Sequence, residues 1–190
     1  MQLTNNKVDR NSELIIRPAK SEDTRKLAEI LTHSFYDFPD YLSWMYPLLQ
    51  FTISEDLRYR LRSSSPLYYC LVAIMPQTDG SLEIAGTVEI SLRSPSFWAY
   101  NAQYPYISNL AVHKNYRRQK IGSQLLAQCD RIALDWGYDE IRLHVLDKNH
   151  PARKLYTNNG YHISQIEPHW GKFLLDYSHR LLLKKQINLT

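Results

Sequence analysis

Apolar side chains recur at helical spacing in the second half of the chain. The series keeps one face of a helix over about four turns, and its members are Ile121, Leu125, Leu126, Cys129, Ile132, Ala133 and Trp136. A glycine follows directly, and glycine is the residue that most often ends a helix. The pattern predicts a helix over residues 121–136 that stops at Gly137.

Three further stretches are predicted to be helical. The first covers residues 21–35, with Ser21 as its N-cap, and one face of it carries Leu27, Ile30, Leu31 and Phe35. The second covers residues 47–62 and begins with a proline, which suits a helix start but not a helix interior. The third is short, with Pro151 near its start and Gly160 at its end.

Strands are predicted where β-branched and aromatic residues gather between turn residues, at residues 13–18, 67–75, 82–92, 106–112, 140–146, 161–166 and 172–183. Asp79 and Gly80 indicate a hairpin between two of them. Strands that alternate with helices predict an α/β fold, a mixed sheet with helices on both faces. We expect residues 13–185 to form a single domain behind a disordered tail, residues 1–12.

Composition narrows the possible classes of protein. The chain has 190 residues, 44% of them hydrophobic, and a net charge of +4. This charge is small for a nucleic-acid binder, and no apolar run is long enough to cross a membrane. We therefore expect no nucleic-acid and no membrane partner, and, without a secretory signal, a cytoplasmic location. Cys70 and Cys129 have no metal-ligand spacing and are predicted to be core thiols, so no metal site is expected.

Positive charge is concentrated where the helix at Ile121 begins. Arg117, Arg118 and Lys120 precede this helix start, which is already the positive end of the helix dipole. A phosphate there would accept hydrogen bonds from the free amides and from the two guanidinium groups. A solvated basic turn is the alternative on these residues alone. Neither a Rossmann nor a Walker pattern is present.

Two motifs resemble the GNAT acyltransferase superfamily, and within it most nearly the protein N-terminal acetyltransferases of the ribosomal-protein type. The first is Arg117 to Gly122, where Lys120 replaces the usual glycine or alanine. The second is "NHPARKLYTNNGY" at residues 149–161. The resemblance covers residues 13 to about 183 and implies a six- to seven-stranded mixed sheet with splayed strands forming an acetyl-CoA cleft. The implied cofactor contacts are Leu110, Ala111, Val112, Arg117, Arg118, Gln119, Lys120, Ile121, Gly122, Ser123, Asn149, Ala152 and Tyr156.

The same resemblance implies catalytic groups for acetyl transfer to an amine. Tyr156 is the candidate acid for the CoA thiolate, and the Val112 amide is the candidate oxyanion donor. His144, in "LHV", is the candidate general base, because a neutral imidazole with a pKa of about 6.5 accepts a proton at neutral pH. A structural hydrogen bond is the alternative for this histidine. Glu89, Tyr106 and Asn109 are rival groups that could hold a water.

The acceptor is expected to be a primary amine. An α-amine with a pKa of about 8 has a substantial neutral fraction at neutral pH, whereas a lysine with a pKa of about 10.4 is neutral only roughly one time in a thousand, so a histidine base favours a protein or peptide N-terminus. The aromatic segment "FYDFPDYLSWMYP" and the loop "SFWAYNAQYPY" are predicted to wall the acceptor groove. The predicted acceptor contacts are Phe38, Tyr41, Glu89, Tyr106 and Asn109.

Two other functions remain open from the sequence. A small-amine acetyltransferase acting on a polyamine, amino acid or aminoglycoside would need a carboxylate cluster, for which Asp37, Asp40 and Glu89 are the candidates. A non-catalytic acyl-CoA sensor would lack a base and an acid. The presence of both His144 and Tyr156 argues against a sensor.

Overall fold

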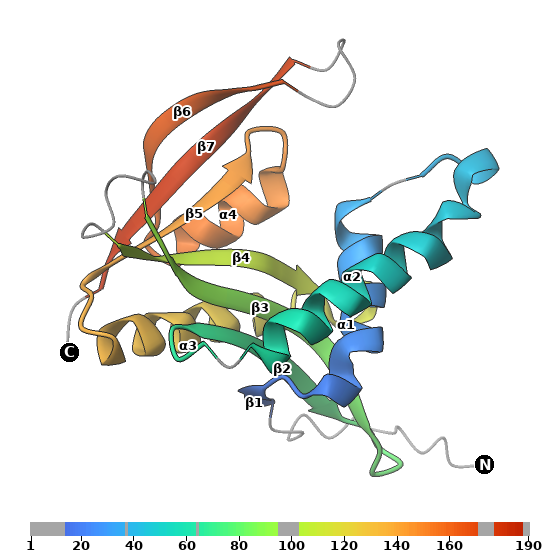
Figure 1. The fold of residues 1–190 in the computed structure, drawn as a ribbon. Coiled ribbons are helices and arrows are strands. Elements are labelled where there is room, and N and C mark those ends of the chain that lie inside the picture. Colours follow the sequence, from blue (N-terminus) through green and yellow to red (C-terminus); the bar gives the residue numbers. More distant parts are fainter. Residues whose placement is uncertain (1–13, 37, 64, 95–102, 171–176, 188–190) are drawn as a thin grey trace, which may run out of the picture.

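A computed structural model describes residues 14–36, 38–63, 65–94, 103–170 and 177–187. The fold is a seven-stranded mixed sheet in the order β1-β2-β3-β4-β5-β7-β6, with four α-helices, which confirms the predicted α/β class (Figure 1). The strands are β1 (Ile15–Pro18), β2 (Tyr68–Pro76), β3 (Leu82–Arg93), β4 (Tyr104–Val112), β5 (Glu140–Leu146), β6 (His162–Trp170) and β7 (Tyr177–Gln186). The helices are α1 (Thr24–Phe35), α2 (Met45–Arg62), α3 (Ile121–Asp135) and α4 (His150–Asn158), with single 3-10 turns η1 (Ser21–Asp23), η2 (Asp40–Leu42) and η3 (Lys114–Tyr116).

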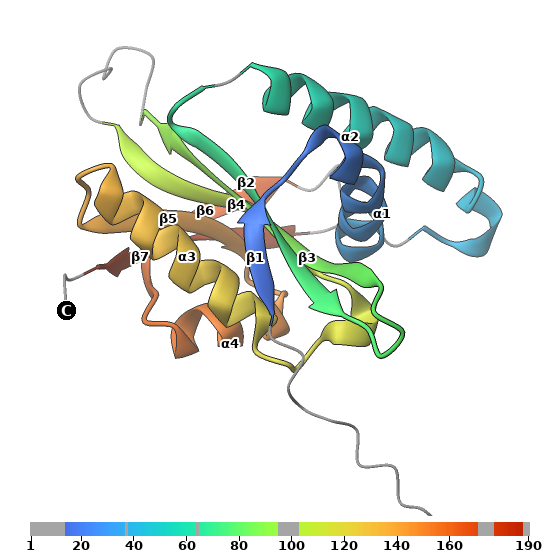
Figure 2. The ribbon, with the colours of Figure 1, turned by 90° about the horizontal axis from the view of Figure 1, so that it is seen from below.

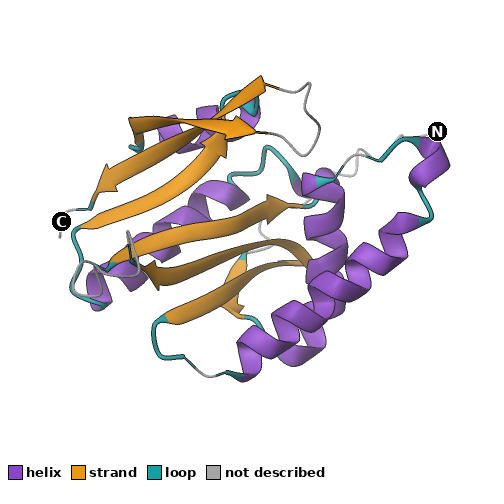
Figure 3. Ribbon diagram, turned by 45° about the horizontal axis from the view of Figure 1, so that its top comes forward, coloured by secondary structure: helices purple, strands orange, loops and turns teal. Residues whose placement is uncertain are grey.

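The sheet consists of two halves that separate at its middle. All neighbouring strands are antiparallel except β4 and β5, which run parallel and pair only at Tyr106 with Arg142 and at Ile107 with Leu143. Beyond these pairs the two strands diverge, and Figure 3 shows the half formed by β1 to β4 turned away from the half formed by β5, β7 and β6. The predicted splayed strands are therefore present.

Helices cover both faces of the sheet. On one face, α3 and α4 pack against a core that includes Val88, Ile107 and Leu143. On the other face, Leu27 of α1 and Leu57 of α2 pack on the first half of the sheet only (Figure 2). The surface of β5 and β7 on this second face is thus left without a helix. Cys70 and Cys129 are both buried and unpaired, as predicted.

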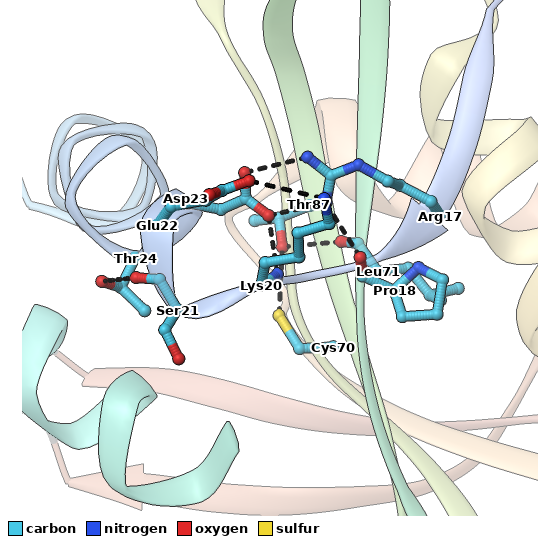
Figure 4. A network of polar contacts seen from close by, with 10 residues as sticks. All are labelled: Arg17, Pro18, Lys20, Ser21, Glu22, Asp23, Thr24, Cys70, Leu71 and Thr87. Carbon is cyan, nitrogen blue, oxygen red and sulfur yellow. Dashed lines mark hydrogen bonds and ion pairs between the residues drawn. The ribbon is translucent and has the colours of Figure 1, made fainter. Parts of the chain in front are cut away.

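The junction between β1 and α1 differs from the prediction. Ser21 does not cap the helix with its side chain; its carbonyl accepts a hydrogen bond from the Thr24 hydroxyl at 2.9 Å. The buried Asp23 closes the 3-10 turn η1 before the helix, because its Oδ2 accepts from the Lys20 amide at 2.7 Å and its carboxylate binds both terminal nitrogens of Arg17 at 2.7 and 3.0 Å (Figure 4). A carboxylate that bridges two elements holds the chain more firmly here than a serine hydroxyl would.

Helix and strand ends account for the other differences. Helix α2 begins at Met45, so Pro47 lies inside its first turn, where an amide needs no partner. Strands β6 and β7 extend to Trp170 and Gln186. Gly137 and Gly160 have φ values of +84° and +87°, which confirms their roles as helix ends. The predicted tail, Asp37, most of the aromatic loop (95–102) and residues 172–176 lie outside the described residues.

No described helix has both the length and the apolarity needed to cross a bilayer.

Candidate active site

A cleft of about 530 Å³ opens where the end of β4 meets the start of α3 and the first turns of α4. Every residue that the resemblance assigned to the cofactor contributes to its wall except Gln119. The wall also contains residues that sequence reasoning missed: Ser34, Phe35, Tyr116, Pro151, Lys154, Leu155 and Asn158. Helical spacing from Pro151 gave a signal for the α4 members, whereas nothing local in the sequence pointed to the end of α1.

The entrance to α3 has an unusual backbone. Arg118 and Lys120 have φ values of +69° and +62°, in the left-handed region that ordinarily favours glycine. The Arg117 guanidinium donates from Nε to the Val112 carbonyl at 3.1 Å, which ties the turn back to β4. The result is a tight turn that brings three cations and the unpaired first amides of α3 to one wall of the cleft.

Helix α4 lies close against the first turn of α3. A Cβ on Gly122 would come within 2.9 Å of Cδ2 of Leu155, so a larger residue here would require this leucine side chain to shift. The Asn159 amide donates to the Ser123 hydroxyl at 3.0 Å and joins the two helices a second time. Gly122 thus leaves room for the Leu155 side chain of α4 beside the start of α3.

The second motif builds the opposite wall of the cleft. Asn149 caps α4, because its Oδ1 accepts from the Ala152 amide at 3.2 Å. Two turns after Asn149, Tyr156 is buried but lines the cleft, and its ring meets Tyr161 edge-on with the ring centroids 5.8 Å apart. Burial raises the pKa of the Tyr156 phenol well above its usual value, so the hydroxyl keeps its proton at neutral pH.

His144 lies on the sheet face that carries α1 and α2, outside the wall of the cleft. Its Nδ1 is 2.8 Å from the Tyr106 hydroxyl, and its Nε2 is 3.4 Å from Oε1 of Glu167. Arg180 binds the other carboxylate oxygen of Glu167 at 2.7 Å. Burial lowers the pKa of His144, Arg180 lowers it further, and Glu167 offsets only part of this. The imidazole is therefore neutral at pH 7.

Two of the other predicted acceptor contacts are bound to each other. Asn109 donates from Nδ2 to Oε1 of Glu89 at 2.9 Å. Arg60 of α2 binds Oε2 of the same carboxylate, which is only 2% exposed. Burial raises the pKa of Glu89, and the Arg60 charge and the Asn109 hydrogen bond oppose that rise. Neither Glu89 nor Asn109 lines the cleft.

The remaining predicted acceptor contacts lie beyond the end of α1. The Phe38 ring meets Tyr46 at 5.0 Å in an edge-on arrangement, and its amide donates to the Tyr46 hydroxyl at 3.2 Å. Tyr41 is 77% exposed. Both lie apart from the cleft wall, although Phe35, at the end of α1, joins the two regions. Within the described ranges, no three His, Cys, Asp or Glu side chains lie close enough to share a metal ion.

Comparison with known proteins identifies the relatives of this chain. The model of the acetyltransferase (GNAT) family matches residues 25–161. GCN5-related N-acetyltransferase 10, chloroplastic, of Arabidopsis thaliana is 30% identical over 76% of this chain and 60% of its own length. Thialysine N-epsilon-acetyltransferase of Bos taurus is 34% identical over 58% of this chain and 66% of its own length. The chain thus spans less than two thirds of both relatives.

A solved structure supports the same fold. The ribosomal-protein-S18-alanine N-acetyltransferase of Escherichia coli superposes with a TM-score of 0.65 at 14% identity, covering 94% of this chain and 96% of the other. At this level of identity the likeness concerns the fold. It agrees with the seven-stranded split sheet described above.

Proposed function

The chain belongs to the acetyltransferase (GNAT) family, and on that premise we propose that it transfers the acetyl group of acetyl-CoA to a primary amine, most favourably a protein or peptide N-terminal α-amine. The observation that carries this proposal is the contact between Tyr106 and His144. A neutral imidazole with a fixed tyrosine partner lies where the sheet splits, on the part of the second face that α1 and α2 do not cover. The proposed transfer needs such a proton acceptor for the attacking amine.

The cleft suits acetyl-CoA in size and in charge. Its volume of about 530 Å³ lies within the range usual for cofactor sites. The first amides of α3, with Arg117, Arg118 and Lys120, would bind the diphosphate. The backbone of residues 110–112 would bind the pantetheine arm, which leads toward the gap between β4 and β5.

The chain's own groups account for each proton in the transfer. The amine nitrogen attacks the thioester carbonyl, so that a C–N bond forms and the C–S bond then breaks. The Val112 amide would stabilise the oxyanion that forms in between. His144, directly or through a water held with Tyr106, takes the proton that the amine loses. Tyr156 then gives its proton to the departing thiolate. Its raised pKa keeps the phenol protonated until that step.

The charges around His144 favour an α-amine over a polyamine. Arg93 lies 3.6 Å above the Tyr106 ring, and Arg180 neutralises Glu167. Their positive charge disfavours an acceptor that carries several ammonium groups and favours the neutral form of an amine. An α-amine has a lower pKa than a lysine side chain, so a larger fraction of it is neutral at a given pH.

The second candidate is a small-molecule amine acetyltransferase. The similarity to thialysine N-epsilon-acetyltransferase of Bos taurus favours it. The carboxylates proposed to attract such a cation do not form a cluster in the described part of the chain, since Glu89 is bound to Arg60 and Asp40 lies at the start of η2. A non-catalytic acyl-CoA sensor is less well supported. It would need neither the neutral imidazole of His144 bound to Tyr106 nor the phenol of Tyr156 in the cleft wall.

The proposed function is tested by incubating the protein with labelled acetyl-CoA against a peptide library and a panel of polyamines, amino acids and aminoglycosides. We expect label on peptide N-termini, with His144→Ala reducing turnover strongly but leaving CoA binding intact. His162→Ala, on the exposed edge strand β6, is the matched control and should behave as wild type. Label on the small amines alone would favour the second candidate. Label on neither class would reject the proposed transfer.

A further inference from the structure

Glu89 is a fully buried carboxylate that joins three separate elements. It lies on β3, accepts a hydrogen bond from Asn109 of β4 at 2.9 Å, and forms an ion pair with Arg60 of α2. A buried charge is tolerated only where partners replace its lost hydration, and here each carboxylate oxygen has one. The group lies outside the cleft wall, and no step of the proposed transfer uses it.

Its hydrogen-bond partner Asn109 sits at a break in the sheet. The pairing of β3 with β4 shifts between Thr87 and Glu89, because Val88 alone faces both Asn109 and Leu110. This β-bulge places Asn109 at a φ of +53°, a left-handed conformation that asparagine tolerates better than most residues. The Glu89 carboxylate holds the Asn109 side chain and so holds the bulge in this conformation.

The bulge determines where the next residues of β4 point. Leu110 belongs to the bulge, Ala111 and Val112 come directly after it, and all three form part of the wall of the cleft. An extra residue bends a strand and increases its local twist, so it redirects the residues that come after the bulge. Without the bulge, the backbone groups of these three residues would keep the regular direction of the sheet.

We propose that Glu89 is a positioning residue: anchored by Arg60, it fixes the bulge at Asn109 and thereby aims the backbone of residues 110–112 at the pantetheine arm. This inference rests on the proposed function for the identity of the ligand. It also gives α2, whose N-terminal end adjoins the predicted acceptor groove, a direct polar connection to the cofactor strand through Arg60.

The geometry separates this role from that of a general base. Both carboxylate oxygens are occupied by donors, and the side chain is 2% exposed, so neither an amine nor a water reaches it from the cleft. A base would also have to release its proton to solvent after each turnover. Glu89 is thus better suited to hold backbone than to move protons.

A double-mutant cycle of Glu89→Gln and Asn109→Ala tests the proposal, with CoA affinity measured by calorimetry. Each single variant is expected to weaken CoA binding by about tenfold, the usual effect of losing a hydrogen bond to a charged group. The double variant should be little weaker than either single one, because both act through the same contact. Asn109→Gly, which adopts a positive φ freely, should recover part of the loss. Additive effects, or unchanged affinity in both single variants, would overturn the proposal.

Two further measurements test the positioning role of Glu89 separately from the proposed function. Hydrogen exchange at the amides of residues 110–112 in the unliganded protein should quicken in both single variants but not in Glu55→Gln, a matched surface ion-pair variant of α2. This readout does not depend on CoA, so failure of the wild type to bind CoA would reject the proposed function alone. In turnover assays Glu89→Gln should raise the KM for acetyl-CoA and keep the acid limb of the pH profile. Loss of that limb would make Glu89 a base and overturn its positioning role.

Discussion

The Tyr106 hydroxyl and Nδ1 of His144 lie 2.8 Å apart, although 38 positions separate the two residues in the chain. Tyr106 belongs to one of the two residue pairs that join β4 to β5. The contact thus spans the two halves of the sheet at the last place where they meet. It fixes the orientation of the imidazole next to the point of divergence.

Removing this contact should slow the reaction. Tyr106→Phe is expected to lower kcat about three- to tenfold, the effect of losing one neutral hydrogen bond that orients the imidazole. The KM for acetyl-CoA should stay unchanged, because Tyr106 does not line the cleft. Tyr104→Phe, on the same strand, is the control, and steady-state kinetics with the best acceptor compares the two. Equal rates in both variants would contradict a role for the Tyr106 hydroxyl.

The pKa of His144 should lie below 6.5, since burial and Arg180 both disfavour the imidazolium. NMR titration of the ring, assigned with the His144→Ala variant, measures it directly. Glu167→Gln should lower the pKa further, because the lost carboxylate stabilises the protonated form. As pH falls through this pKa the ring can no longer accept a proton, so the acid limb of the rate profile should move to lower pH in Glu167→Gln. A limb that moves upward would contradict this arrangement.

Tyr156→Phe should reduce kcat by about tenfold to a thousandfold while CoA affinity stays within about threefold, because only the acid is lost and the ring still fills its place. Tyr161→Phe is the matched control: its hydroxyl is buried without a hydrogen-bond partner, so its removal should leave activity intact and stability equal or higher. Pre-steady-state release of CoA, followed with a thiol reagent, separates the two. Normal release in Tyr156→Phe would reject this acid.

Arg118→Ala should weaken binding of CoA, with a smaller effect on pantetheine, which lacks the diphosphate. A loss of about tenfold is expected for one charge-assisted hydrogen bond. The effect should shrink as salt rises, because the side chain is exposed. Arg131→Ala removes an equal charge from the outer side of α3 and should change nothing. Calorimetry that finds the two variants alike would dismiss Arg118 as a phosphate contact.

Lys120→Gly should raise the free energy of unfolding by about 1 kcal/mol, since a left-handed φ is unfavourable for lysine and open to glycine. Lys120→Ala keeps a Cβ and should gain nothing. Both variants lose the same ammonium group, so equal losses of CoA affinity would assign the effect to charge. Denaturant titration measures the stability difference, and a stabilised alanine variant would contradict the backbone argument.

Helix positions and helix ends could be predicted from the sequence, because they depend on the spacing and type of neighbouring residues. Helix α3 follows from the apolar period after Ile121, and the caps at Asn149 and Gly160 follow from residue type and position. The family resemblance implied most of the cleft wall, and the residues that it missed are two on α1, Tyr116 on η3 and four on α4.

Contacts between distant segments were beyond the reach of these rules. Glu89 meets Arg60 across 29 positions, and His144 meets Glu167 across 23. A carboxylate in a strand looks the same in sequence whether it faces a substrate or a buried arginine. Asp23, rather than Ser21, holds the turn before α1 for a more local reason, because Arg17 at the end of β1 binds its buried carboxylate.

Beyond Ile107 the backbone of β4 does not pair with β5, so the middle of the sheet contains a stretch of unpaired strand edge. Open backbone of this kind attracts any chain that can pair with it, including a second copy of the protein. In the proposed complex the amides of the pantetheine arm would pair with this backbone, and a bound ligand makes the folded form more favourable. An occupied gap would then also offer less open backbone for faulty association.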